Sequence, residues 1–227
     1  LPILAIIPSI GNVFNYKVVR KLWKANKNND SLTNNRNQIG NMERRLITHE
    51  EPTSPIAEAY RSLRTSLMYT NKGSQGSIMI SSPGPGEGKT TTIINLAITY
   101  ANLGKKTILI DTDLRKPVIH KIFNSSNEYG LTHYISGIEK KINTIIHPTD
   151  IDNLDIIYNG AIPPNPSELL GSELMQDMVN KLKAEYDILL FDAPPIMAVT
   201  DAVVLSRLID QFILVVRCGK TDKDSIE

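Results

Sequence analysis

The chain has 227 residues, of which 41% are hydrophobic and 22% are charged, which suits one α/β domain with a buried core plus an extension. Its only cysteine, Cys218, excludes an internal disulfide and fits a reducing compartment. The sequence contains no recognisable signal peptide and no apolar run long enough to cross a membrane.

Basic residues gather in the N-terminal part of the chain. Residues 17–45 contain eight lysines and arginines against two acidic residues, although the net charge of the whole chain is only +1. Together with Trp23, this segment could lie on an anionic membrane surface or form a merely solvated amphipathic helix, and the sequence leaves both open. Residues 25–42 are rich in asparagine and have the composition of a linker. Nucleic-acid binding is not expected, because the only aromatic residues among these basic ones are Tyr16 and Trp23.

The first strong helix signal lies at residues 53–68. Residues 53–55, Thr-Ser-Pro, supply a hydroxyl cap and a first-turn proline, and apolar residues then recur along one stripe. Glu58, Arg61 and Arg64 recur every three residues on another face. A charged stripe of this kind is usually solvated and contributes little as isolated ion pairs.

A strand at residues 78–80 runs into a glycine-rich loop and then into a helical pattern. The glycines let backbone N–H groups turn around phosphate oxygens, and the helix N-terminus adds a positive field. Lys89 would reach the β- and γ-phosphates of a nucleotide, and the Thr90 hydroxyl would bind Mg²⁺. Pro83 stands where the strict phosphate-loop pattern has glycine. The predicted nucleotide contacts are Gly84, Pro85, Gly86, Glu87, Gly88, Lys89, Thr90 and Thr91.

Strands and helices alternate through the rest of the chain. Apolar runs predict strands at residues 106–111, 154–158, 188–192 and 212–216. Helices are predicted at residues 118–123, 131–136, 172–185 and 200–208, and Ser167 is predicted to cap one more. This alternation predicts an α/β fold of the P-loop NTPase type, in which helices flank both faces of a mostly parallel sheet.

Acidic residues follow two of the predicted strands. Asp111 and Asp113 end one strand, and Asp192 ends another. Carboxyl ends of parallel strands meet at one edge of a sheet, so these acids should lie beside Lys89 and Thr90. A carboxylate at that place is the usual partner of Mg²⁺ near a phosphate loop.

The number of acids exceeds what a single magnesium ion needs, which suggests that one of them is a general base. A tyrosine hydroxyl, with a pKa of about 10, benefits from an acceptor for its proton. Asp111 and Asp113 are both candidates for that base, and the sequence does not separate them well. Asp111 is nearer to the buried strand end and is therefore predicted to be the base, and Asp113 and Asp192 are predicted to support the metal together with Thr90. Arg115 could neutralise charge on the transferred phosphoryl group or form a structural ion pair, and the sequence does not decide.

These motifs together resemble those of the bacterial tyrosine kinases. Residues 81–90, 108–115 and 188–195 are similar to the Walker A, A′ and B motifs of that family. Residues 54–65 resemble its E-x-x-R-x-x-R helix, and residues 160–170 resemble its proline-rich segment before a helix. The resemblance covers roughly residues 45–227, and its details are most similar to the staphylococcal capsule kinases.

The resemblance implies an ATP- and Mg²⁺-dependent protein-tyrosine kinase that controls capsular polysaccharide synthesis and export. Glu58, Arg61 and Arg64 would dock on the next subunit of a ring-shaped homo-oligomer such as an octamer. Subunits would phosphorylate one another on a C-terminal tyrosine cluster, which this sequence does not contain, since its last tyrosine is Tyr186. The kinase would work at the cytoplasmic face of the membrane, held there by a membrane activator.

The N-terminal residues resemble a different protein, namely the cytoplasmic tail of such an activator. The expected division is an activator tail at residues 1–29, a linker and N-terminal kinase extension at 30–50, and the kinase domain at 51–227. The asparagine-rich join would then be a fusion junction between activator and kinase.

Two other functions compete with the kinase interpretation. An ATPase switch of the ParA/MinD type would carry a second lysine four residues before the final loop glycine, where this chain has Gly84. A non-catalytic scaffold would use nucleotide only to control assembly, and the presence of Lys89 with all three aspartates argues against it.

Overall fold

The computed structural model describes residues 5–7, 46–70 and 76–221 of the chain. The basic segment, the asparagine-rich linker and the expected fusion junction lie outside the described residues, as does most of the expected activator tail.

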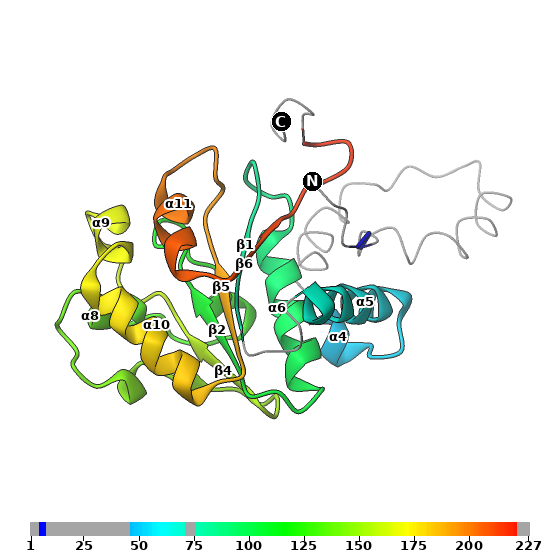
Figure 1. The fold of residues 1–227 in the computed structure, drawn as a ribbon, viewed down its shortest axis with the longest axis horizontal. Coiled ribbons are helices and arrows are strands. Elements are labelled where there is room, and N and C mark those ends of the chain that lie inside the picture. The colour runs from blue at the N-terminus through cyan, green and yellow to red at the C-terminus, as the bar shows by residue number, and fades with distance from the viewer. Residues whose placement is uncertain (1–4, 8–45, 71–75, 222–227) are drawn as a thin grey trace, which may run out of the picture.

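A six-stranded sheet forms the centre of the domain, with the strand order β3-β4-β2-β5-β1-β6 (Figure 1). Every neighbouring pair is parallel except the short edge strand β3, which runs antiparallel to β4. The strands are β1 (Gly76–Ser81), β2 (Thr107–Asp111), β3 (His147–Pro148), β4 (Leu154–Ile157), β5 (Ile188–Asp192) and β6 (Gln211–Leu214).

Helices cover both faces of this sheet. Figure 1 shows α4, α5 and α6 on one side, and α8, α9, α10 and α11 on the other. The helical elements are α4 (Ile47–Glu50), α5 (Pro55–Thr70), α6 (Lys89–Ala101), α7 (Ile119–Ile122), α8 (Leu131–Ile135), η1 (Ile142–Thr144), α9 (Pro166–Leu170), α10 (Glu173–Glu185), α11 (Asp201–Leu205) and η2 (Ser206–Leu208). Within the described ranges, none of the helices combines the length and the apolar character needed to cross a membrane.

Two hydrophobic cores form because successive strand residues point to opposite faces of the sheet. In β5, Leu190 joins the core beneath α5 and α6, whereas Leu189 and Phe191 join the core beneath α8 and α10. All five residues of β5 are buried, as expected for a central parallel strand covered on both sides. The predicted fold class is therefore confirmed.

The main differences from the sequence prediction concern short elements and one cap. Helix α4 and strand β3, of four and two residues, were not predicted. Helix α9 has Asn165 at its N-cap position, so the predicted capping role of Ser167 is wrong; its hydroxyl donates instead to Asp201. The predicted cap of α5 is confirmed, since the Ser54 hydroxyl accepts a hydrogen bond from the Ala57 amide at 3.1 Å.

Candidate active site

The strand order brings the predicted functional groups to one edge of the sheet. Strand β5 lies between β1, which leads into the phosphate loop, and β2. The parallel register of β2 and β5 pairs Asp111 with Asp192, and that of β1 and β5 pairs Ile80 with Asp192. Three segments that are distant in the sequence therefore end side by side at their carboxyl ends.

The phosphate loop, residues 82–88, joins β1 to α6. Gly86 and Gly88 have φ angles of +72° and +99°, a left-handed conformation that residues with a side chain rarely adopt. Gly88 is the N-cap residue of α6, and the helix begins at Lys89. The loop therefore ends at the positive end of a 13-residue helix, as an anion-binding loop requires.

Lys89 is the electrostatic centre of the site. Its ammonium nitrogen lies 3.2 Å from Asp113 Oδ2 and 3.3 Å from Asp192 Oδ1. The same nitrogen donates to Thr90 Oγ1 at 3.2 Å, and the Thr90 hydroxyl donates to Asp192 Oδ2 at 2.7 Å. Four of the predicted site residues thus form one connected cluster.

The pKa values of this cluster reflect burial opposed by ion pairing. Burial lowers the pKa of Lys89, but the Asp192 and Asp113 carboxylates outweigh this effect and raise the pKa above its ordinary value. Burial raises the pKa of Asp192, and Lys89 and the Thr90 hydroxyl only partly offset the rise. The positive charge of Lys89 is what allows two carboxylates to share a buried place.

Asp111 stands slightly apart from this cluster and is fully buried. Its Oδ1 accepts a hydrogen bond from the Asp113 amide at 3.3 Å, and its Oδ2 accepts one from the Ile119 amide at 3.4 Å. Burial, followed by the charge of Asp192, holds the pKa of Asp111 well above its usual range. A carboxylate with a raised pKa is a better proton acceptor than an ordinary surface aspartate.

Arg115 forms an ion pair that the sequence left open as an alternative. Its Nε and Nη2 donate to Asp201 Oδ2 and Oδ1 at 2.9 and 3.2 Å, and Asp201 also accepts a hydrogen bond from Ser167. Burial raises the pKa of Asp201, but the hydrogen bonds from Arg115 and Ser167 outweigh it and lower the pKa overall. Asp201 therefore ties together the loop after β2, the start of α9 and the start of α11.

Sequence reasoning missed Asp201, and it assigned Ser167 to a different role. An aspartate in the first turn of a helix is common, so nothing local distinguishes Asp201 from an ordinary first-turn acid. Arg115 lies in the A′ segment, and a guanidinium held against the protein requires an anionic partner. That requirement is the sequence signal that could have prompted a search for an acidic partner.

The three charged residues of α5 differ in their surroundings. Glu58 and Arg61 form an ion pair with their charged atoms 2.6 Å apart. Arg64 is half-buried, and its Nη1 donates to the Thr99 carbonyl of α6 at 2.6 Å. Arg61 is also half-buried, and its Nη2 donates to the Pro52 carbonyl just before α5, whereas Arg64 joins α5 to α6 of its own chain.

The residues present suit a nucleotide with a magnesium ion. The described ranges contain no group of three or more His, Cys, Asp or Glu residues arranged to hold a metal ion. Mg²⁺ does not require one beside a phosphate loop, because it takes most of its ligands from water and phosphate. Thr90 Oγ1 and Asp192 Oδ2 are oxygen donors 2.7 Å apart beside the phosphate loop, which is the donor type that Mg²⁺ prefers.

Comparisons with known proteins agree with this geometry. A family model described as an AAA domain matches residues 76–224. The tyrosine-protein kinase YwqD of Bacillus subtilis is 41% identical over 190 residues, covering 83% of this chain and 80% of its own. The putative tyrosine-protein kinase CapB of Staphylococcus aureus is 37% identical and covers 80% of both chains.

Solved structures with a similar fold are also known. The crystal structure of the chimerical protein CapA2B2 is 39% identical, covers 80% of each chain and superposes with a TM-score of 0.77. The septum site-determining protein MinD of Pyrococcus horikoshii, solved with Mg-ADP, is more distant, with 25% identity, a TM-score of 0.53 and coverage of 62% of this chain and 57% of its own.

Proposed function

The chain belongs to the AAA-domain family and to the bacterial tyrosine-protein kinases, and is therefore a protein-tyrosine kinase. We propose that its phosphate loop and strand-end carboxylates transfer the γ-phosphoryl group of ATP to tyrosine. The observation that carries this proposal is the cluster in which Lys89 contacts Thr90, Asp113 and Asp192 at the end of the phosphate loop. Asp111 lies beside that cluster in the register of the sheet.

Each group has a role that its position supports. The loop amides and Lys89 bind the β- and γ-phosphates. The tyrosine oxygen attacks the γ-phosphorus, the bond to the β-phosphate oxygen breaks, and Asp111 takes the phenolic proton. Thr90, Asp113 and Asp192 would hold the Mg²⁺ ion, which neutralises charge on the phosphate oxygens. Arg115 has a positioning role, because its guanidinium is engaged with Asp201.

The wider setting is also a proposal. We propose an activator tail at residues 1–29, a linker and extension at 30–50, and a kinase domain at 51–227. This division is supported by the similarity to the chimerical protein CapA2B2. The tail would hold the kinase at the cytoplasmic face of the membrane, and a ring of subunits such as an octamer would phosphorylate tyrosines between neighbours. Control of capsular polysaccharide synthesis is supported by the relatives, which include CapB.

The activity is tested by incubating the purified chain with labelled ATP, Mg²⁺ and a tyrosine-rich peptide. We expect label on tyrosine, and we expect the Lys89→Met variant to be inactive, because the site then loses the positive charge that pairs with Asp113 and Asp192 and that would bind the β- and γ-phosphates. The matched control is Lys105→Met, since Lys105 precedes the amino end of β2 at the opposite edge of the sheet.

The same assay separates the competing functions. Hydrolysis of ATP without phosphotyrosine would favour a switch of the ParA/MinD type, which the structural likeness to MinD keeps as a second candidate. Binding of ATP with no turnover of either kind would favour an assembly scaffold.

The proposed subunit interface has its own test. We expect the double variant Glu58→Ala/Arg61→Ala to convert the oligomer to monomers in light scattering with at most a small fall in melting temperature, because Glu58 is exposed and the contacts of Arg61 to Glu58 and to the Pro52 carbonyl are local. Arg64→Ala should instead lower the melting temperature, since Arg64 holds α5 to α6. Arg207→Ala, on an exposed residue of η2, is the matched control. An unchanged mass for the double variant would contradict the docking role.

A further inference from the structure

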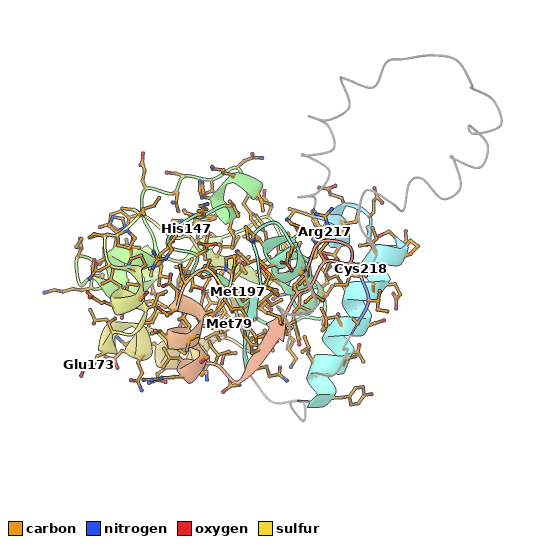
Figure 2. All side chains as sticks on the ribbon, turned by 90° about the horizontal axis from the view of Figure 1, so that it is seen from above. Met79, His147, Glu173, Met197, Arg217 and Cys218 are labelled. Carbon is orange, nitrogen blue, oxygen red and sulfur yellow. The ribbon has the colours of Figure 1, made fainter. Side chains whose placement is uncertain are left out.

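The segment that follows β6 lies across the outside of the phosphate loop. We call residues 217–221 the clamp segment; Figure 1 draws it in red, and Figure 2 labels Arg217 and Cys218 within it. Lys220 Nζ donates to the Pro85 carbonyl at 2.7 Å, and Arg217 Nη1 donates to the Gly86 carbonyl at 3.4 Å. The Thr221 hydroxyl donates to Glu87 Oε2 at 2.6 Å. Three consecutive residues of the loop are therefore contacted by one segment that lies 131 to 135 positions later in the chain.

The two carbonyl contacts fix the direction of two loop amides. In a trans peptide unit, the carbonyl oxygen of one residue and the N–H of the next point to opposite sides. The peptide bonds of the described residues include no cis bond. Lys220 and Arg217 hold the Pro85 and Gly86 carbonyls toward the clamp segment, so the N–H groups of Gly86 and Glu87 point away from it. Amides with this orientation are the groups that bind phosphate oxygens in such a loop.

The third contact controls a negative charge inside the loop. Glu87 is buried, with 8% of the residue exposed, although a carboxylate beside bound phosphates would repel them. Its Oε1 accepts a hydrogen bond from the Gly84 amide at 2.9 Å, and its Oε2 accepts the one from Thr221. These two donors hold the carboxylate in a fixed place and reduce the charge that it presents to its surroundings.

The end of the Lys220 side chain lies close to the loop backbone. The Cβ position of Gly86 is 2.7 Å from Lys220 Nζ, so a side chain at residue 86 would displace the end of Lys220 from the loop. The clamp segment itself turns at Gly219, which has a φ of +75°, and closes on the backbone through Lys220 and Thr221, whose amides both donate to the Arg217 carbonyl at 3.0 Å. The clamp segment is therefore a closed turn whose side chains contact the loop.

We propose that the clamp segment is a positioning element for ATP binding, in which Lys220 and Arg217 orient the phosphate-binding amides and Thr221 restrains the Glu87 carboxylate. The inference rests on the proposed function, since it concerns binding of ATP by the same loop. None of the three residues is assigned contact with the reacting atoms, so each acts through the loop.

The test measures the affinity of the full chain for ATP with Mg²⁺ by titration calorimetry. Thr221→Val removes the hydroxyl at nearly constant volume and is expected to weaken ATP binding about tenfold, as loss of a hydrogen bond to a charged group would. Thr221→Ser restores the hydroxyl and should bind ATP as the unaltered chain does. Lys220→Met should weaken binding to a smaller extent, because Lys220 contacts a neutral carbonyl at the surface, and Lys105→Met should not change it.

A second variant separates restraint of charge from general damage to the fold. Glu87→Gln keeps an acceptor for the Gly84 amide and can still pair with Thr221, but it removes the charge. The double variant Thr221→Val/Glu87→Gln is therefore expected to bind ATP within about threefold of Glu87→Gln alone, because no carboxylate is left to restrain. A threonine needed only for folding would not be rescued in this way, and its loss would lower the melting temperature in both backgrounds.

The outcomes distinguish this inference from the function on which it rests. If the unaltered chain fails to bind ATP, the proposed function is wrong, and the proposed role of the clamp segment is wrong as well. If the unaltered chain binds ATP and Thr221→Val binds it equally well, only the proposed role of the clamp segment is wrong. The same conclusion follows if Thr221→Ser binds ATP as weakly as Thr221→Val does. Failure of Glu87→Gln to rescue Thr221→Val would overturn the role in restraining charge.

Discussion

Replacing Asp111 by asparagine is expected to slow tyrosine phosphorylation by about 10²–10⁴-fold, the usual contribution of a positioned general base. The carboxylate is fully buried beside the Lys89 cluster, and burial together with Asp192 raises its pKa, so it accepts a proton more readily than a surface aspartate. Asparagine has nearly the same shape but cannot accept the phenolic proton. The measurement is the initial rate of phosphotyrosine formation at saturating ATP and Mg²⁺.

Magnesium titration distinguishes a base from a metal ligand. Asp113→Asn and Asp192→Asn should raise the Mg²⁺ concentration needed for half-maximal activity, because these carboxylates contact Lys89 and Asp192 also contacts Thr90. Asp111→Asn should lower the maximal rate and leave that concentration nearly unchanged. A large shift in the Mg²⁺ requirement of Asp111→Asn, with a maximal rate that recovers at high Mg²⁺, would contradict its role as the base.

The second large effect concerns stability. Replacing Gly130 by alanine is expected to destabilise the domain by at least about 3 kcal/mol, at the upper end of the cost of overpacking. A Cβ at Gly130 would lie 2.1 Å from the Tyr158 carbonyl oxygen and 2.8 Å from the Gly160 amide nitrogen. Both are backbone atoms, so no side chain can rotate to make room. The expected fall in melting temperature is about 10 °C for a domain of this size, measured by calorimetry.

Gly104→Ala is the matched control for Gly130→Ala. Gly104 has a φ of +80° but no atom near its Cβ position, so alanine there should cost only about 1 kcal/mol of conformational strain. Gly130 has an extended backbone that alanine adopts without strain, so its cost comes from contact alone. Equal melting temperatures for the two variants would contradict the close packing of Gly130, before α8, against the Tyr158 carbonyl after β4.

Sequence patterns alone were enough to predict the fold class and the residues that meet at the candidate active site. Lys89 and Thr90 follow an apolar strand through a glycine-rich loop, and Asp111 and Asp192 each end an apolar strand. Such signals are local, because a short run of residues dictates both the strand and the group at its end. The rule that parallel strands present their carboxyl ends at one edge then brings those groups together without knowledge of the strand order.

The contacts between groups that are distant in the sequence could be identified only in the folded structure. Asp201 was not predicted as the partner of Arg115, Thr221 was not predicted as the partner of Glu87, and nothing near Gly130 shows that the Tyr158 carbonyl lies against it. Arg64 shares the spacing of Glu58 and Arg61, yet it donates to the Thr99 carbonyl of its own chain. The physical reason is that helix and strand patterns record only which side of an element is buried. The partner of each charge depends on how elements pack, and packing joins residues that the sequence keeps far apart.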